Sequence, residues 1–196
     1  MIIIAEMYIT LMPVIIAGIF NMLWIKLPYM KILLIPIDNN KLFFDGKRIF
    51  GENKTWKGFL GMILLGGVAS VLWGRLCSRI VYLNEHNYLY RNIDNTLVYN
   101  LCIGFLLGLV YAIFELPNSF LKRRLDIIPG KKGKGLSGIL FVFIDQVDSI
   151  VGCIMVIGAV YRISISFYVA YVFLGAATHI VINVFLYTFK LRRNMF

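Results

Sequence analysis

The chain has 196 residues, of which 60% are hydrophobic and only 15% are charged, and its mean hydropathy is +0.79. Soluble domains of this length are nearer half apolar and a quarter charged, so the composition excludes a water-soluble globule and indicates a chain embedded in lipid. The net charge is +10. In a membrane protein such an excess of basic residues indicates which loops are cytoplasmic and suggests anionic ligands. Binding to nucleic acid is the weaker interpretation of this charge.

Five apolar runs are each long enough to cross a membrane as a helix. A hydrocarbon core of about 30 Å requires about 20 helical residues, and an open sheet cannot satisfy its backbone hydrogen bonds there. The sequence therefore predicts an all-α integral membrane protein that forms a single domain over residues 1–196. The expected spans are roughly residues 7–25, 56–74, 97–114, 136–161 and 167–189.

Basic residues are distributed unequally between the loops. Seven lie between the first two spans or at the edge of the second, six lie between spans three and four, and three follow the fifth, against four in the other intervals. Loops rich in Lys and Arg stay in the cytoplasm. We therefore expect the N-terminus outside, the C-terminus in the cytoplasm, and two long cytoplasmic loops at residues 26–55 and 115–135.

The first of these loops contains a turn signal. Asp45 and Gly46 lie between two short β-prone segments, KLFF and KRIF. This pattern is typical of a tight two-residue hairpin. A loose loop fits the sequence about equally well.

Two acidic residues, Asp145 and Asp148, lie within the fourth expected span. If the helix began after them, residues 150–161 would supply only about 18 Å of helix, which is too short to cross. The i, i+3 spacing places both carboxylates on one face, where they repel unless a positive group lies beside them. A divalent cation such as Mg²⁺ meets this need. The alternative is a structural pair bonded to Lys or to backbone, but ionisable residues at this depth are usually functional.

Two groups near the end of the third span are expected on the same side of the membrane as the aspartates. Glu115 ends that span and either completes a metal site or simply reaches solvent at the helix end. The consecutive bases Lys122, Arg123 and Arg124, with the hydroxyl of Ser119 upstream, are suited to holding phosphates. A basic run beside a span also sets topology, so its charge alone does not decide between the two roles.

A third group begins the second span. Asn53 or Thr55 can cap the helix, and a helix N-terminus with free amides beside Lys54 is an anion site. The alternative is a capped span with an interfacial Trp and a Lys that reaches solvent. The second and fourth helices begin, and the third ends, on one side, so all these groups are expected to converge.

Other patterns are less informative. The glycine-rich segment 130–137 is not a phosphate-binding P-loop, because Leu136 stands where a Lys is required and no strand precedes it. His179 lies inside the fifth span and is interpreted as a helix-packing residue rather than a ligand. The three cysteines have no ligand-like spacing and predict neither a zinc site nor a disulfide framework.

At these residues the chain resembles the CDP-archaeol synthase family, small relatives of the phosphatidate cytidylyltransferases. The combination of SFLKRR with DQVD is a specific indication of this family, whereas KTWKG alone would be a weak one. The resemblance implies an integral membrane enzyme that uses CTP and Mg²⁺ to convert a lipid phosphate into a CDP-lipid, with release of pyrophosphate. The matching elements are PID at 36–38, DGKRIFGENKTWKG at 45–58, ELPNSFLKRR at 115–124, PG at 129–130 and DQVDSIVG at 145–152.

The resemblance also implies roles for individual residues. Asp145 and Asp148, with Glu115, would bind the metal, and Lys122 would join the two aspartates in catalysis. The active site would face the cytoplasm in the cell membrane. The sequence leaves open whether K⁺ assists Mg²⁺ and whether the lipid is ether-linked or ester-linked. Nucleotide or lipid phosphates would lie near Asp38, Asn53, Lys54, Thr55, Ser119, Lys122, Arg123 and Arg124.

Three other functions remain open at this point. A CDP-alcohol phosphotransferase also carries aspartates in a membrane helix, but its motif requires further acids and an Arg, and residues 149–161 contain no acid or base. A cation or phosphate transporter with an intramembrane aspartate site is a second alternative, although no inverted repeat or matched pair of broken helices is visible. A noncatalytic lipid-binding protein is the third.

Overall fold

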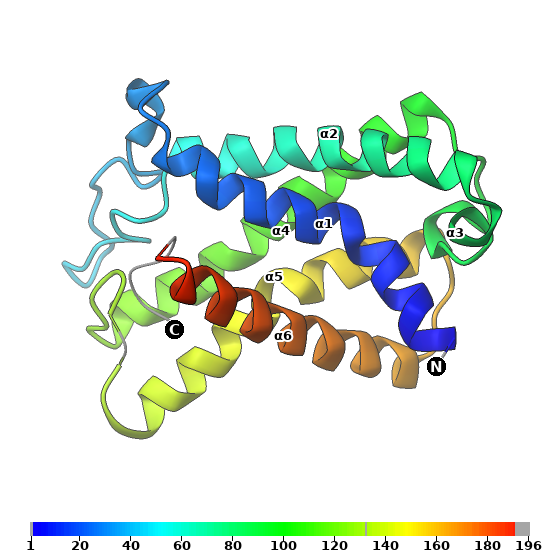
Figure 1. Cartoon of the computed structure of the whole chain (residues 1–196). Coiled ribbons are helices and arrows are strands. Elements are labelled where there is room, and N and C mark those ends of the chain that lie inside the picture. The colour runs from blue at the N-terminus through cyan, green and yellow to red at the C-terminus, as the bar shows by residue number, and fades with distance from the viewer. Residues whose placement is uncertain (1, 132, 191–196) are drawn as a thin grey trace.

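Helices account for the regular structure of this protein (Figure 1). The computed structural model describes residues 2–131 and 133–190. Each of the five long helices is long and apolar enough to cross a membrane, which confirms the all-α architecture with five expected spans. These are α1 (Ile2–Lys26), α2 (Trp56–Arg79), α4 (Leu97–Arg124), α5 (Gly135–Val160) and α6 (Ile165–Thr188), joined by the short helices η1 (Lys31–Leu34), α3 (Val81–Glu85) and η2 (Tyr88–Tyr90).

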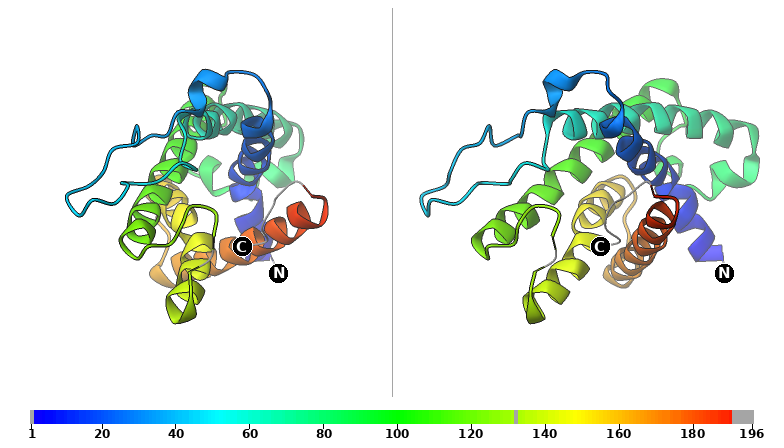
Figure 2. Two further views of the ribbon diagram at one scale, coloured as in Figure 1. Left: turned by 90° about the vertical axis from the view of Figure 1, so that its left-hand side faces the viewer. Right: turned by 60° about the vertical axis from the view of Figure 1, so that its left-hand side comes forward.

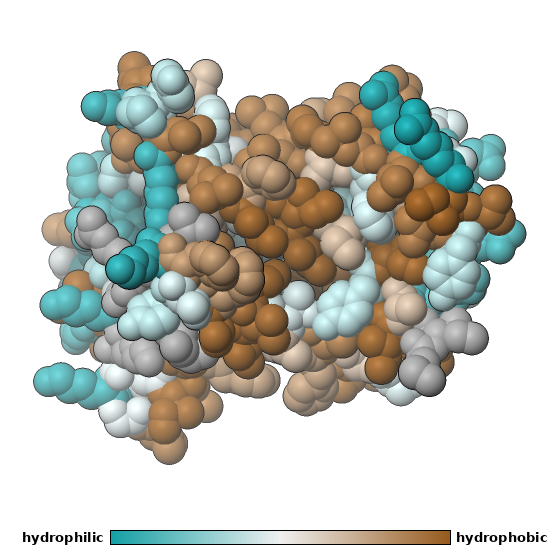
Figure 3. Space-filling model, viewed as in Figure 1, coloured by the Kyte–Doolittle hydropathy of each residue, from teal (hydrophilic) through white to brown (hydrophobic). Residues whose placement is uncertain are grey.

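Both long loops lie at one end of the helix bundle. Residues 27–55, 125–131 and 133–134 are on the left in Figure 1, and the short connections 80–96 and 161–164 are at the other end. We call the end that carries the two long loops the basic end, because most of the Lys and Arg residues that the structure describes lie there. A broad apolar band separates the polar side chains of the two ends, as expected for a protein that spans a bilayer (Figure 3).

The third span is longer than predicted. α4 does not end at Phe114 but continues through Pro117 to Arg124, so the second long loop begins at residue 125 rather than 115. The three bases in its last turn lie beside the negative end of the helix dipole, which stabilises this extension. The extension keeps the whole ELPNSFLKRR motif on one rigid helix.

The predicted two-residue hairpin at Asp45-Gly46 is wrong in detail. Phe43 accepts a hydrogen bond from the Gly46 amide (2.9 Å) and donates its own amide to Lys47 (2.8 Å), so the loop contains three residues. Gly46 has φ +74°, the left-handed conformation that such a three-residue turn requires. Among the described residues the flanking segments form no strand, and the only pairing beside this turn is a single bridge between Leu42 and Arg48.

Small residues allow α2 and α4 to approach closely. A side-chain Cβ at Gly66 would lie 2.5 Å from the Gly104 carbonyl oxygen and 3.3 Å from the Gly108 Cα. Close backbone approach of this kind is how helices associate in lipid, where no hydrophobic effect drives them together. By contrast, α6 packs on α5 and makes few direct contacts with α1 in the described part of the chain (Figure 2).

A buried carboxylate ties α1 to the connection before α4, at the end opposite the loops. Glu6 is only 8% exposed. Its oxygens accept hydrogen bonds from the Arg91 guanidinium (2.5 Å) and the Tyr88 hydroxyl (2.5 Å). Burial and the neighbouring carboxylate raise the pKa of Tyr88, so the phenol remains a donor. The Arg91 guanidinium also lies 4.2 Å from the centre of the Tyr88 ring.

Replacing Arg91 with Ala is expected to destabilise the protein strongly. The change leaves Glu6 buried without its positive partner, which typically costs about 3–5 kcal/mol. Thermal unfolding of the purified protein measures the loss. The double variant Glu6→Gln, Arg91→Met removes both charges and is expected to unfold at a higher temperature than Arg91→Ala. An Arg91→Ala protein with the wild-type unfolding temperature would contradict this assignment.

Candidate functional site

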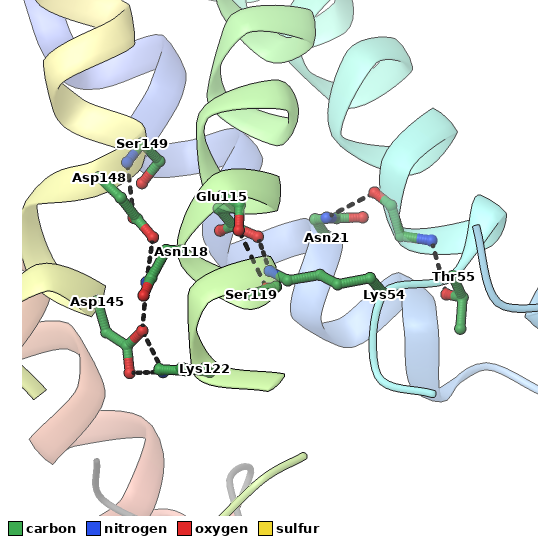
Figure 4. A network of polar contacts seen from close by, with 11 residues as sticks. Asn21, Lys54, Thr55, Glu115, Asn118, Ser119, Lys122, Asp145, Asp148 and Ser149 are labelled. Atoms are coloured by element: carbon green, nitrogen blue, oxygen red, sulfur yellow. Dashed lines mark hydrogen bonds and ion pairs between the residues drawn. The ribbon is translucent and has the colours of Figure 1, made fainter. Parts of the chain in front are cut away.

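The two intramembrane aspartates converge on one amide side chain. Asn118 on α4 donates to Asp145 Oδ1 (2.6 Å) and to Asp148 Oδ2 (2.7 Å), as Figure 4 shows. The Asn118 carbonyl oxygen is buried and has no hydrogen-bond partner among the described residues. Asp148 also accepts the backbone amide of Ser149 (2.6 Å). Two carboxylates and the amide group of Asn118 therefore meet at the interface of α4 and α5.

Lysines neutralise the carboxylates in this arrangement. Lys122 Nζ lies 2.5 Å from both oxygens of Asp145, and Lys54, which precedes α2, pairs with Glu115. Burial would lower the pKa of Lys54, but Glu115 and the two aspartates raise it above its usual value, so the ammonium stays charged. Within residues 2–131 and 133–190, no three His, Cys, Asp or Glu side chains converge closely enough to hold a metal ion alone.

Glu115 therefore lies beside the aspartate pair rather than on it. Its carboxylate points toward Lys54, while Asp145 and Asp148 point toward Asn118 (Figure 4). The place of Glu115 in a metal site stays a prediction. The ion pair nevertheless brings the segment before α2 to the Glu115–Arg124 part of α4, which is the convergence that the sequence predicts.

A second polar cluster lies next to Lys54, where three segments meet. A Cβ at Gly51 would lie 2.9 Å from Pro129 and 3.6 Å from the Arg123 guanidinium, and one at Gly130 would lie 3.2 Å from the Asn53 amide nitrogen. Both glycines have positive φ, +102° and +73°, which other residues rarely adopt. Arg123 is 9% exposed, and its Nε has no hydrogen-bond partner among the described residues. A buried guanidinium with a free donor is suited to an anion.

Three of the expected phosphate ligands use their side chains within the protein. Thr55 caps α2, since its hydroxyl accepts the Gly58 amide (3.2 Å), as predicted. Ser119 donates to the Glu115 carbonyl (3.0 Å). Arg124 is 2.7 Å from Asp45 and donates to the Arg48 carbonyl (2.5 Å). Contact of these three with a phosphate stays a prediction, and Arg124 holds the hairpin against α4.

Asp38 organises the first loop from inside. Its side chain is fully buried and accepts hydrogen bonds from Arg48 (2.5 Å) and from the backbone amides of Gly51 (2.8 Å), Phe50 (3.0 Å) and Asn40 (3.1 Å). Burial opposes its ionisation, but Arg48 and the three amides together lower the pKa of Asp38 to about 2. In this arrangement the carboxylate holds the loop that carries Asn53 and Lys54, and its contact with a substrate stays a prediction.

The variant Asp38→Asn is expected to lower stability in a pH-dependent way. The folded pKa of about 2 lies below the ordinary value of 3.8, a difference equivalent to about 2 kcal/mol. This stabilisation is fully present above pH of about 4 and is lost as the pH falls through the folded pKa. Thermal unfolding of both proteins between pH 7 and pH 2.5 should therefore show a gap that narrows markedly in acid. Unfolding temperatures that stay parallel at all pH values would contradict the assignment.

A cavity of about 330 Å³ connects the polar residues with the membrane interior. Its polar end is formed by Asn53, Lys54, Glu115 and Asp145. Its other walls combine mostly apolar side chains of α1 with α6 residues that include the polar Thr178, His179 and Asn183, and these two helices contact each other little. The volume lies within the range of ligand sites. The apolar wall residues include Leu11, Val14, Ile15, Ile19, Met22 and Ile182.

Amide side chains inside the spans were missed as site residues by the sequence analysis. Asn118, which bridges the aspartates, was noted only as part of a motif. Gln146 is almost fully buried and accepts a hydrogen bond from Asn183 on α6 (2.9 Å). The available signal was an uncharged polar residue inside an apolar run, since such residues usually bond to another helix. His179, expected to pack between helices, lines the cavity with its ring 6.1 Å from that of Tyr111.

Comparisons with known proteins agree with this architecture. A sequence model of the CarS-like CDP-archaeol synthase family matches residues 2–196. The chain is 38% identical over 101 residues to the CDP-archaeol synthase of Pyrococcus furiosus, a match that covers 52% of each protein. It is 28% identical over 181 residues to that of Thermofilum pendens, covering 92% of this chain and 75% of the relative.

One solved structure is similar in fold. It is described as an intramembrane enzyme for archaeal membrane lipids biosynthesis. The TM-score is 0.62 at 24% sequence identity, and the similarity covers 92% of this chain and 94% of the other. The likeness supports the arrangement of the five long helices.

Proposed function

The chain belongs to the CDP-archaeol synthase family, and from that premise we propose that it transfers CMP from CTP to a lipid phosphate, forming a CDP-lipid and pyrophosphate. One observation carries the proposal. One cavity has charged residues at its polar end, and many of its other lining residues are apolar side chains, most of them on α1. Such a cavity can take a phosphate at its polar end while the hydrocarbon part of the same molecule stays among α1 and α6.

The lipid substrate is expected to reach this cavity from the bilayer. Because α1 and α6 contact each other little, the apolar chains of a lipid phosphate can lie between them without first leaving the membrane. The names of the relatives indicate an ether-linked isoprenoid lipid as the preferred substrate. The two alternatives with an intramembrane aspartate site, a phosphotransferase and a transporter, are not favoured by the family match.

Asp145 and Asp148 are the residues that would hold Mg²⁺. Their donor set fits a hard cation, because two carboxylates converge on Asn118, whose buried carbonyl oxygen has no protein partner among the described residues. When bound, the ion would supply positive charge to the phosphates. Lys122 pairs with both oxygens of Asp145, so its ammonium lies at the same donor set and would meet a phosphate bound there.

The chemistry requires position and charge rather than a protein nucleophile. An oxygen of the lipid phosphate attacks the α-phosphorus of CTP and forms a new P–O bond. The bond between the α-phosphorus and the oxygen that bridges it to the β-phosphorus breaks, and pyrophosphate leaves with that electron pair. Charge develops only on phosphate oxygens, which Lys54, Lys122 and Arg123 are placed to stabilise. Gly51 lets the loop before α2 pack closely against Pro129 and Arg123, and Gly130 lies close to the Asn53 amide.

The active site is expected to face the cytoplasm of the cell membrane. Sixteen of the 20 basic residues belong to the sequence intervals expected to be cytoplasmic, because positively charged loops are retained in the cytoplasm. CTP is a cytoplasmic nucleotide, so the same orientation supplies the substrate.

Incubation of the purified protein with labelled CTP, Mg²⁺ and a panel of lipid phosphates tests the proposal. We expect CDP-lipid and pyrophosphate in equal amounts, with the ether-linked isoprenoid phosphate turned over fastest. An ester-linked diacylglycerol phosphate is the matched comparison. Failure of every lipid phosphate to yield a CDP-lipid would overturn the proposed reaction, and faster turnover of the diacyl lipid would overturn only the choice of substrate.

A further inference from the structure

The nine residues that follow α1 expose an unusual amount of apolar surface. Residues 27–35 include the single 3₁₀ turn η1, and none of the residues in that turn is buried. Six large apolar side chains in this segment are between 41% and 77% exposed. Such a run in water would be unfavourable and needs an apolar partner. The six are Leu27, Tyr29, Met30, Ile32, Leu34 and Ile35.

Backbone hydrogen bonds hold this segment at the level of the helix ends. The Leu27 amide donates to Trp24 in α1 (3.2 Å), and Ile35 accepts the amide of Trp56, the first residue of α2 (3.1 Å). Pro36 then forms a bridge with Thr55. Both ends of the segment are therefore fixed next to the membrane-spanning helices, and it cannot extend into the aqueous phase.

A buried lysine fixes the segment further. Lys57, in the first turn of α2, is fully buried, and its ammonium donates to the carbonyls of Leu27 (2.6 Å) and Tyr29 (2.8 Å). It also lies 5.2 Å from the centre of the Trp24 ring. Burial of an ammonium costs free energy unless its N–H groups are hydrogen-bonded. Here they bond to backbone carbonyls just after α1, which have no partner within that helix. The proposed reaction makes no use of this lysine.

The depth of the helix ends places the segment in the membrane interface. The 25 residues of α1 span about 37 Å, against about 30 Å for the hydrocarbon core. The ends of α1 therefore lie among the lipid head groups. Viewed onto the basic end, the segment lies on the rim of the bundle beside α1 and α2, not over its centre (Figure 2, left). Its exposed side chains are thus continuous with the lipid-facing band.

We propose that residues 27–35 are an interfacial membrane contact that lies in the head-group region of the leaflet at the basic end. The occupant of its apolar surface is the lipid of that leaflet, with Ile32 and Leu34 reaching the acyl boundary. Tyr29 and Lys31 have the chemistry preferred at this depth, an amphipathic ring and a cation for lipid phosphates. Because Lys57 joins the segment to α2, this contact sets the height of the cavity-lining helix α1 against the head groups.

Spin labels that report depth test the proposal directly. A nitroxide attached to Ile32→Cys, in a Cys102→Ser background, avoids Cys77 and Cys153, which are both fully buried. The protein is placed as a single copy in lipid nanodiscs, and collisions with oxygen and with a water-soluble nickel chelate are measured. Leu64→Cys on the exposed middle of α2 is the lipid control, and Lys41→Cys in the first loop is the aqueous control.

We expect the oxygen-to-nickel collision ratio at Ile32 to be several-fold above that at Lys41 and to approach that at Leu64. A label on Tyr29→Cys provides a second site in case the first variant folds poorly. A ratio equal to that of Lys41 at both sites would overturn the proposal. So would protection from both reagents accompanied by spin–spin broadening in nanodiscs holding two copies, because the partner would then be a second chain.

The tether is tested separately by Lys57→Met. Loss of the ammonium should increase the mobility of the label at Ile32 and leave the label at Leu64 unchanged. Lys57→Arg retains the charge and donors and is expected to restore part of the immobility. Equal label mobility in the wild type and in Lys57→Met would overturn the role of Lys57. None of these measurements depends on catalytic activity, so they stand or fall independently of the proposed reaction.

Discussion

Asp145→Asn and Asp148→Asn should each reduce CDP-lipid formation by about two orders of magnitude or more, because even outer partners of a metal ion cost 10- to 100-fold when removed. Each change keeps the shape of the side chain and removes the negative charge that a cation requires. Both residues meet at Asn118 and lie at the polar end of the site. Steady-state turnover of labelled CTP with a lipid phosphate measures the effect.

The control for this prediction is the same substitution at a carboxylate outside the site. Asp126 is largely exposed at the basic end and pairs with Lys47. Its φ of +55° is one that Asn tolerates, so Asp126→Asn should retain nearly normal turnover. A folded, membrane-inserted Asp148→Asn protein with near wild-type turnover would remove the metal assignment. A matched loss in Asp126→Asn would show that the effect is not specific to the aspartate pair.

The five spans could be predicted because hydropathy depends only on local composition. Their ends could not, since the continuation of α4 through Pro117 depends on the helix dipole and on contacts with distant segments. The hairpin was misjudged for a similar reason. Its three-residue turn is secured by Arg124, which stacks on Phe43 and bonds to Asp45, and no local pattern specifies those partners.

The sequence predicts those site residues that carry a charge within an apolar membrane-spanning segment. Asp145 and Asp148 stand out in the sequence because charged residues are costly at that depth. Their partner Asn118 does not, because its contact with both carboxylates depends on the rotation and register of α4 against α5. The same holds for the Gln146–Asn183 bond between α5 and α6. The predicted contact of Asp38 with a substrate stays a prediction, and its buried hydrogen bonds to the first loop could not be read from the sequence because they join residues brought together by the fold.

CTP binding should weaken about 10- to 100-fold in Arg123→Ala, Lys54→Ala and Lys122→Ala, because hydrogen bonds to charged groups contribute about 1.5–3 kcal/mol each. Arg123 is expected to show the largest loss. Its buried guanidinium has an Nε without a protein acceptor among the described residues, whereas Lys54 and Lys122 already bond to carboxylates and must exchange one partner for another. Equilibrium binding of a non-hydrolysable CTP analogue in the presence of Mg²⁺ measures each affinity.

Lys41→Ala supplies the control, because it removes a cation from the same end of the molecule at an exposed position in the first loop. General attraction between the basic end and a triphosphate would weaken binding equally in all four variants and would fall with salt. Specific contacts would instead spare Lys41→Ala and rank Arg123→Ala first. Unchanged affinity in Arg123→Ala, Lys54→Ala and Lys122→Ala together would place the triphosphate away from the cluster formed by Gly51, Asn53 and Arg123.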